Sequence, residues 1–135
     1  MTFYPRTLLL ITSFSLFVGG SEAIADNKSV VIDADKTVKR DGLLYEVNKE
    51  TPFTGKVLSK YENGRIKLEA TFKDGQPEGK ATAWHENGQK AREGTFKDGK
   101  EDGKGTKWYE NGQMKSEITY KDGKIIAEKR MGQRR

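Results

Sequence analysis

The sequence predicts an all-β fold, an elongated antiparallel meander of repeated β-hairpins with a 24-residue period. The first observation is a Glu-Asn-Gly triplet that begins at positions 62, 86 and 110. The second is a Lys-Asp-Gly triplet that begins at positions 73, 97 and 121. Asn-Gly and Asp-Gly are turn signals, because these residues accept the positive φ that tight hairpin turns require. Two kinds of turn locked to one period indicate two strands per repeat.

The amino-terminal residues have the pattern of a secretory signal peptide, with cleavage expected after Ala25. Arg6 supplies a positive charge, residues 8–18 form an apolar run, and an A-x-A site ends at Ala25. The alternative is a membrane anchor, but the apolar run is shorter than the roughly 20 residues of a spanning helix. The chain has no cysteine to carry a lipid anchor or a disulfide. We therefore expect a periplasmic or secreted protein.

Several short elements are expected before the first full repeat. Residues 30–32 are consecutive β-branched residues and predict a short strand. Asp41 and Gly42 predict a hairpin turn, followed by a strand at 43–47. Residues 51–55 then lead into the repeats. The expected organisation is a signal peptide at 1–25, an N-terminal extension at 26–40, the repeat domain at 41–123 and a basic tail at 124–135, which begins as a short strand or helix.

A two-residue turn at each Asn-Gly defines the strand pairing by counting. One face of the sheet, the small/aromatic face, then carries small and aromatic residues, and the other, the polar face, carries Lys, Thr and Glu. On the small/aromatic face the expected pairs include Gly55–Phe72, Gly79–Phe96, Gly103–Tyr120, Tyr61–Ile66, His85–Lys90 and Tyr109–Met114. On the polar face they include Lys60–Lys67, Trp84–Ala91 and Trp108–Lys115.

The two turn types are expected to differ in tightness. The Asp-Gly turns are expected to be looser loops of about four residues, within the usual hairpin range. In each repeat an aromatic ring is expected to lie over the bare backbone of the glycine that faces it. The turn residues predicted to be structural are Asn63, Gly64, Asp74, Gly75, Asn87, Gly88, Asp98, Gly99, Asn111, Gly112, Asp122 and Gly123. The core is thin, so the sheet must curl or be covered by the N-terminal strands or by a partner.

The repeated segments resemble the bacterial MORN-repeat variant. The resemblance rests on Tyr-Glu-Asn-Gly at 61–64, Phe-Lys-Asp-Gly-Gln-Pro-Glu-Gly-Lys at 72–80 with their two echoes, and Pro-Phe-Thr-Gly-Lys-Val at 52–57. It covers residues 41–123. It implies elongated hairpin repeats that serve as interaction or scaffold modules. Some bacterial relatives are described as antitoxins, and eukaryotic relatives are linked to membrane phospholipids.

No arrangement of residues suggests catalysis, a metal site or a cofactor. His85 is the only histidine, and it occupies the repeat position of Tyr61 and Tyr109. The acidic segment 98–103 lacks the spacing of a calcium loop and is better explained by its turn. No nucleophile with a partnering base and no phosphate-binding glycine loop is present. We therefore predict that the protein is not an enzyme and needs no cofactor or metal.

Two tryptophans are the strongest candidates for a binding surface. Trp84 and Trp108 share one repeat position on the polar face, where they either pack on Lys and Thr stems or form an aromatic strip for a partner. The candidate interaction surface comprises Trp84, Trp108, Tyr61, Tyr109 and His85.

The charge of the chain does not indicate a nucleic-acid partner. The net charge of +5 is concentrated in residues 121–135, and the rest of the expected mature chain is close to neutral. The leading hypothesis is a non-catalytic exported module that binds another protein. The alternatives are a cell-envelope module that binds glycan or anionic lipid, and an antitoxin or immunity protein of a toxin–antitoxin system.

Overall fold

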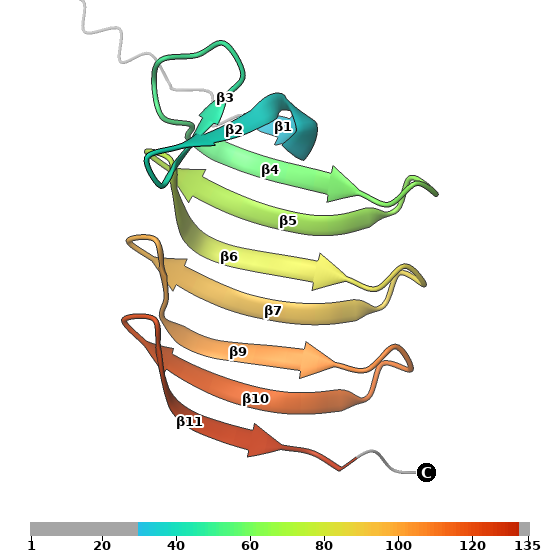
Figure 1. Ribbon diagram of the computed structural model, residues 1–135. Helices are drawn as coiled ribbons and strands as arrows, with labels where there is room; N and C mark the ends of the chain where they lie inside the picture. Colours follow the sequence, from blue (N-terminus) through green and yellow to red (C-terminus); the bar gives the residue numbers. More distant parts are fainter. Residues whose placement is uncertain (1–29, 133–135) are drawn as a thin grey trace, which may run out of the picture.

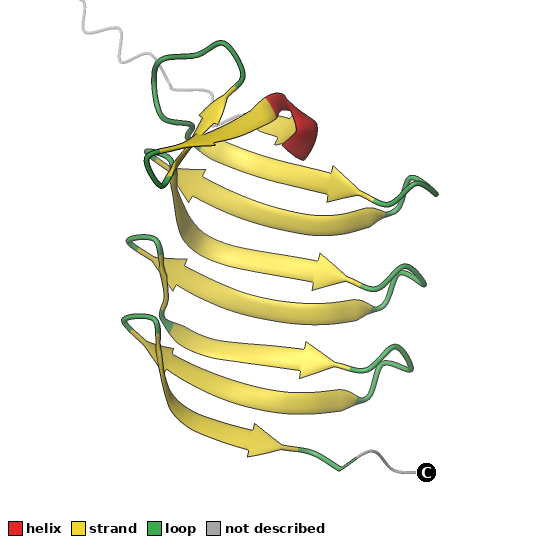
Figure 2. Ribbon diagram, in the orientation of Figure 1, coloured by secondary structure: helices red, strands yellow, loops and turns green. Residues whose placement is uncertain are grey.

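The computed structural model describes residues 30–132, so the expected signal peptide and its cleavage site lie outside the described residues. One short 3-10 helix, η1 (Ala34–Lys36), is the only helical segment in this part of the chain (Figure 2). The strands are β1 (Val31–Asp33), β2 (Thr37–Arg40), β3 (Leu43–Glu46), β4 (Gly55–Lys60), β5 (Ile66–Lys73), β6 (Gln76–Trp84), β7 (Lys90–Lys97), β8 (Lys100–Glu101), β9 (Gly103–Trp108), β10 (Met114–Lys121) and β11 (Lys124–Arg130).

The predicted meander of hairpins is confirmed. Within residues 30–132 the large sheet has nine strands in the order β1-β4-β5-β6-β7-β9-β10-β11, with β8 paired to β7 (Figure 1). The Asn-Gly turns lie at one end of the strands and the Asp-Gly turns at the other. The expected N-terminal strand is β1, which pairs parallel with β4. The turn at Asp41 and Gly42 joins β2 and β3 into a separate two-stranded sheet.

Away from the Asn-Gly turns, the strand register agrees with the predicted one. Because each of these pairs is set by the same residue count, the agreement recurs in every repeat. The glycine–aromatic pairs are Gly55–Phe72, Gly79–Phe96 and Gly103–Tyr120.

The Asn-Gly turns are three-residue loops, and the predicted two-residue type I′ turn is wrong. In the first turn, Gly64 N–H donates to Tyr61 O at 2.9 Å, and Tyr61 N–H donates to Arg65 O at 2.8 Å. Gly64 has a φ of 82°, but Asn63 does not have a positive φ. Asn63 Oδ1 instead accepts a hydrogen bond from Arg65 N–H at 2.9 Å. A type I turn followed by a left-handed glycine is the common three-residue hairpin.

Each three-residue loop shifts the pairing near the turn by one residue. In the second repeat Lys90 pairs with Trp84, and Ala91 becomes the extra residue of a β-bulge. His85 therefore pairs with Gln89, to whose carbonyl it donates its N–H at 2.8 Å. The bulge moves Lys90 to the polar face. The predicted pairs that are wrong for this reason are Tyr61–Ile66, Lys60–Lys67, His85–Lys90, Trp84–Ala91, Tyr109–Met114 and Trp108–Lys115.

The Asp-Gly turns are the tight ones, so the predicted four-residue loop is also wrong. Asp74 and Gly75 have φ of 49° and 79°, and Lys73 pairs directly with Gln76. Positive φ at both central residues is the signature of a type I′ turn. Asp74 N–H also donates to Thr54 Oγ1 at 2.9 Å, which ties the turn to the neighbouring chain segment.

A wider bulge follows each of the first two Asp-Gly turns of the repeats, and a glycine makes it possible. Between β5 and β6, residues 78–80 oppose Thr71 alone. Gly79 has a φ of 80°, and the equivalent Gly103 has a φ of 98°. The expected contact of the facing ring is not found at Gly79, where an added Cβ would meet no atom within 4 Å. Glycine is needed at these positions because it can adopt a positive φ.

Strand β11 lacks this glycine and has a different register. Ala127 stands at the position of Gly79 and Gly103. The bulge between β10 and β11 holds one extra residue, so that Glu128 faces Ile118. A bulge like the one between β5 and β6 would make Lys129 face Ile118 instead. Because alanine does not readily adopt a positive φ, the smaller bulge is the expected outcome.

The core is concentrated at the amino-terminal end of the sheet. Leu44 and Phe53 cover the small/aromatic face of the first repeat, so the N-terminal strands supply the expected cover there. Leu44 N–H donates to Gly75 O at 2.9 Å, and Phe53 N–H donates to Leu44 O at 2.8 Å. The cluster comprises Leu44, Phe53 and Val57, with Ile32, Ala34 and Phe72 packed against them.

The Asn-Gly turns are tied to one another, which leads to a first prediction. Asn87 Nδ2 donates to Glu110 O at 2.7 Å in the next turn, and its Oδ1 accepts from Gln89 N–H at 2.9 Å. Within residues 30–132, Asn111 makes only the second kind of bond, with Gln113 N–H at 3.0 Å. We expect Asn87→Ala to destabilise the protein by about 0.5–1 kcal/mol more than Asn111→Ala in urea unfolding. Equal losses would contradict a role for the bond between repeats.

Candidate functional site

The two tryptophans lie on the polar face, at the ends of β6 and β9 nearest the Asn-Gly turns. Both side chains are half-buried. Trp84 pairs with Lys90 and Trp108 pairs with Met114. In the second and third repeats the second residue after the three-residue loop therefore lies beside a tryptophan. Sequence counting located the two rings correctly on one face but assigned them the wrong cross-strand neighbours.

Tyr61 and His85 each form a hydrogen bond with the backbone carbonyl of the tryptophan in the next repeat. Tyr61 Oη donates to Trp84 O at 2.7 Å. His85 Nε2 lies 3.1 Å from Trp108 O, which can only accept, so this nitrogen carries the proton. Both residues lie on the preceding turn and reach one repeat forward. They connect consecutive repeats and so position the tryptophans.

Three lysines lie over aromatic rings near the turns. Lys67 Nζ is 5.5 Å from the centroid of the Tyr61 ring. The equivalent Lys115 Nζ is 5.3 Å from the centroid of the Tyr109 ring. In the middle repeat the contact is different, because Lys90 Nζ lies 5.7 Å from the centroid of the Trp108 ring. These distances are within the range of cation–π attraction.

A ladder of ion pairs crosses the polar face, with one rung in each repeat. A surface groove of about 390 Å³ lies along the first two rungs and includes Trp84 and Lys90 in its lining. Surface pairs of this kind contribute little stability individually, so we assign the ladder to surface shape and charge. The rungs are Lys56–Glu69 at 2.8 Å, Lys80–Glu93 at 3.0 Å and Lys104–Glu117 at 3.4 Å.

Glu93 is the centre of this surface. Its carboxylate contacts Lys90 Nζ at 2.6 Å as well as Lys80. Hydrogen bonds from these two ammonium groups, Lys90 first, lower the pKa of Glu93 below its ordinary value. Lys90 is thereby held between the carboxylate and the ring of Trp108. The position of one tryptophan is coupled in this way to the charge on one glutamate.

This coupling gives a pH-dependent prediction. Because the folded-state pKa of Glu93 is lowered, its ion pairs stabilise the fold above pH 4.5 and are lost as the pH falls through the lowered value. We expect the indole N–H chemical shift of Trp108 to titrate in this acid range as Lys90 is released. In Glu93→Gln that step should be missing. Identical titration curves for the two proteins would show that Glu93 does not control Lys90.

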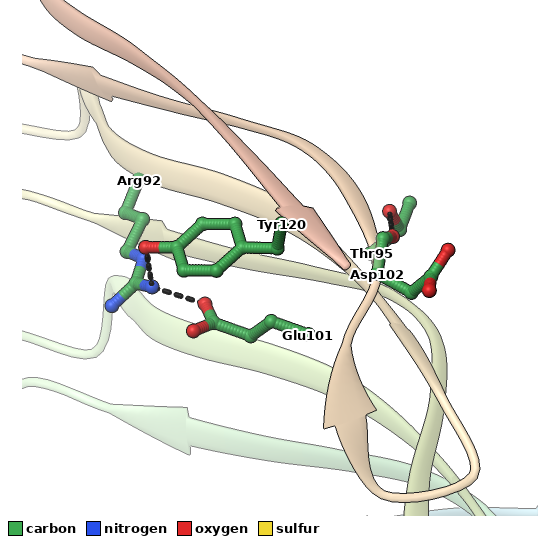
Figure 3. A network of polar contacts seen from close by, with 5 residues as sticks. All are labelled: Arg92, Thr95, Glu101, Asp102 and Tyr120. Carbon is green, nitrogen blue, oxygen red and sulfur yellow. Dashed lines mark hydrogen bonds and ion pairs between the residues drawn. The ribbon is translucent and has the colours of Figure 1, made fainter. Parts of the chain in front are cut away.

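Sequence reasoning missed a second hollow, which lies on the small/aromatic face. It has a volume of about 130 Å³ and is bordered by an ion pair between Arg92 and Glu101. Figure 3 shows this pair, with the Arg92 guanidinium also donating to Tyr120 Oη at 3.4 Å. In the same view Thr95 Oγ1 donates to the Asp102 carbonyl near the bend of the chain. The signal in the sequence was Gly94, which stands where the other repeats have a larger residue.

The described residues offer little for chemistry of other kinds. Among residues 30–132, no group of three or more His, Cys, Asp or Glu side chains could hold a metal ion. Within the same range, no helix has the length and apolar character needed to cross a membrane. In the acidic segment 98–103, Asp98 and Gly99 form the turn itself, and Asp102 Oδ2 pairs with Lys121 at 2.9 Å.

Comparison with known proteins identifies the repeats. The MORN repeat variant family matches residues 53–74, 77–98 and 101–122, one match for each hairpin unit. Repeats of this family generally mediate protein or membrane interactions and are generally not catalytic. No curated protein matches the chain. The three consecutive matches, in register with the strands and turns described above, establish that the chain belongs to the MORN repeat variant family.

Proposed function

We propose that this protein is a non-catalytic binding module that engages a partner protein through its polar face. The observation that carries the proposal is the pair of half-buried tryptophans, Trp84 and Trp108, on one row of that face. Tryptophan is enriched at the energetic centres of protein interfaces. The hydrogen bonds from Tyr61 and His85 to their carbonyls hold the backbone at both tryptophans in place before a partner arrives.

The surroundings of the tryptophans favour a protein partner with charges of both signs. The groove beside Trp84 is lined by alternating Lys and Glu side chains, and the rungs of the ladder are partly exposed. Such a surface can match a complementary pattern of charges, which contributes specificity and association rate. The aromatic rings then supply the apolar contact area at the centre.

The proposal places this interaction outside the cytoplasm. Its support is the signal-peptide pattern of residues 1–25, with cleavage after Ala25, and the absence of cysteine from the chain. A chain without thiols needs no disulfide formation on export. We accordingly expect the partner among periplasmic or secreted proteins. Fractionation of cells that express the full chain would test this, and a product retained in the cytoplasm with residues 1–25 intact would contradict it.

The interaction is tested by affinity capture from an envelope extract with the expected mature protein as bait. We expect a reproducible set of proteins to bind the wild type and to be lost with the Trp84→Ala/Trp108→Ala double variant. Val38→Ala is the matched control, because Val38 is 40% exposed and lies in the separate two-stranded sheet of β2 and β3, which holds neither tryptophan. Equal recovery by the double variant and the wild type would rule out the tryptophan row as the binding surface.

A second candidate function is attachment to an anionic membrane surface, and β11 favours it. Ile125 and Ile126 are 57% and 65% exposed, and basic residues flank them at Lys124 and Lys129. Exposed apolar residues among basic ones bind anionic lipid by partial insertion and charge attraction. We expect cosedimentation with phosphatidylglycerol vesicles that weakens with salt and with Ile125→Ser/Ile126→Ser. Failure to pellet at low salt would exclude this candidate.

A further inference from the structure

We propose that the small/aromatic face carries a separate binding site for an extended acidic peptide segment of a partner. The segment would place one Leu or Phe side chain into the hollow over the second repeat and an acidic side chain against Lys107. This site lies on the face opposite the tryptophans, so it stands independently of the function proposed above.

The hollow has the size and lining of a pocket for one apolar side chain. Its volume of about 130 Å³ is close to that of engineered cavities of about 150 Å³ that hold a benzene ring. Ala81, Ala83 and Gly94 are small residues on neighbouring strands and leave the space open. Leu68 and Phe96 supply larger apolar walls. An apolar side chain placed here would be removed from water on the side that faces the sheet.

The first repeat shows how another segment of chain can cover the small/aromatic face. In the first repeat the equivalent positions include Val57 and Phe72, and Leu44 and Phe53 pack against them. Phe53 N–H donates to Leu44 O and joins the two covering segments to each other, and Gly75 N–H donates to Phe53 O and joins them to the turn between β5 and β6, both at 2.8 Å. The N-terminal strands therefore act as a built-in example of an extended segment with apolar side chains on this face.

One of the small residues that leave the second repeat hollow stands at a variable position of the 24-residue period. That position holds Ala70 in the first repeat, Gly94 in the second and Ile118 in the third. Ile118 is 3% exposed and fills its own repeat. Gly94 leaves the same place empty, and its backbone does not have a positive φ that would require glycine. The hollow continues the surface that Leu44 and Phe53 already cover in the first repeat.

A cationic hollow adjoins the apolar one on the same face. It is about 460 Å³ in volume, and its charged lining residues are Lys107, Lys115, Arg130 and Glu128, three positive charges against one negative. Glu128 is already bonded to Arg130, with Nε–Oε1 at 3.0 Å, and this bond lowers the pKa of Glu128. Lys107 makes no ion pair within residues 30–132. It is the basic group best placed to receive a carboxylate from outside.

The two hollows are spaced for one extended segment. Lys107 on β9 faces Arg92 on β7, which in turn faces Ala83 on β6. Crossing two strand spacings covers about 10 Å, and an extended chain rises about 3.3 Å per residue. Because side chains alternate along an extended segment, an acidic side chain two or four residues from the apolar one would point to the same face and reach Lys107. The confined size of the apolar hollow and the charges beside it favour a peptide over a long acyl chain.

The test uses the expected mature protein and two libraries of short fluorescent peptides. The first library has one Leu or Phe with Asp or Glu two or four positions away, and the second has Lys in place of the acid. We expect selection of the first library over the second by the wild type. Gly94→Val, which fills the hollow, and Lys107→Glu, which reverses the charge, should each weaken the selected peptide about tenfold or more.

The controls separate this site from the tryptophan row and from a folding defect. Trp84→Ala/Trp108→Ala should leave peptide affinity unchanged, whereas it should abolish the partner binding proposed for the polar face. Unchanged thermal unfolding of Lys107→Glu would show that its effect is on binding even if Gly94→Val folds poorly. The proposal is overturned if the wild type does not distinguish the libraries or if Gly94→Val binds equally. Gly94-dependent binding of phosphatidylglycerol vesicles in place of peptide would assign the hollow to lipid and overturn it too.

Discussion

Replacing Gly55 by alanine is expected to destabilise the protein by about 3 kcal/mol. Gly55 has a φ of 152° and lies where the first strand of the repeats meets β1. An added Cβ would lie 2.4 Å from Val30 O and 2.7 Å from Phe53 Cζ. Val30 O cannot move away freely, because it accepts a hydrogen bond from Lys56 N–H at 2.7 Å. The methyl group must therefore displace β1 or the core residue Phe53.

Urea unfolding followed by circular dichroism measures this loss, and Gly79→Ala is its matched control. Gly79 also has a positive φ, 80°, but an added Cβ there would meet nothing within 4 Å. Its cost should be limited to the backbone term of about 1–2 kcal/mol. Hydrogen exchange at Lys56 N–H should accelerate only in Gly55→Ala. Equal destabilisation by the two substitutions would mean that the close approach at Gly55 does not contribute to the loss of unfolding free energy.

Ile118→Ala is expected to cost about 3 kcal/mol, the second large effect. Ile118 is 3% exposed and fills in the third repeat the place that Gly94 leaves empty in the second. Removing three carbons there leaves a cavity that neighbouring strands, held in register by their ladders, can close only in part. Denaturant unfolding and amide exchange across β9 and β10 would detect the loss.

The control for Ile118→Ala is Ile126→Ala in the same part of the chain. Ile126 is the extra residue of the β10–β11 bulge and is 65% exposed, so its truncation should change stability by no more than about 0.5 kcal/mol. Because each repeat contacts only its neighbours, the loss in Ile118→Ala should be strongest in the third repeat. Uniform loss of protection as far as β4 would instead show that the array unfolds as one unit.

Much of the fold was predictable because it follows from local residue types and a fixed count. The 24-residue period gave two strands per repeat, and the pairs Gly55–Phe72 and Gly79–Phe96 followed from it and are confirmed. The N-terminal strand and the turn at Asp41 are also where the sequence predicts them. Family membership followed from the same recurring segments.

The turn types could not be predicted from residue pairs alone. Both Asn-Gly and Asp-Gly can form a type I′ turn, but the structure has it only at Asp-Gly. At Asn63 the side chain bonds to Arg65 N–H in a three-residue loop, and the resulting bulge changes the neighbours of Trp84 and moves Lys90. The same asparagine bond to the N–H two residues on recurs in all three Asn-Gly loops, and the residue pair alone does not reveal it.

The sequence by itself determined the architecture, the number of repeats and the two chemically different faces, because strand alternation and turn chemistry act over a few residues. Only the tertiary structure decided which tryptophan stands beside which lysine, that β11 is shifted by one residue, and that Leu44 and Phe53 cover the first repeat but not the second. These features depend on contacts between different strands rather than on residues adjacent in the sequence. A one-residue bulge beside a turn is enough to change the neighbours of a tryptophan, and strand alternation alone does not reveal it.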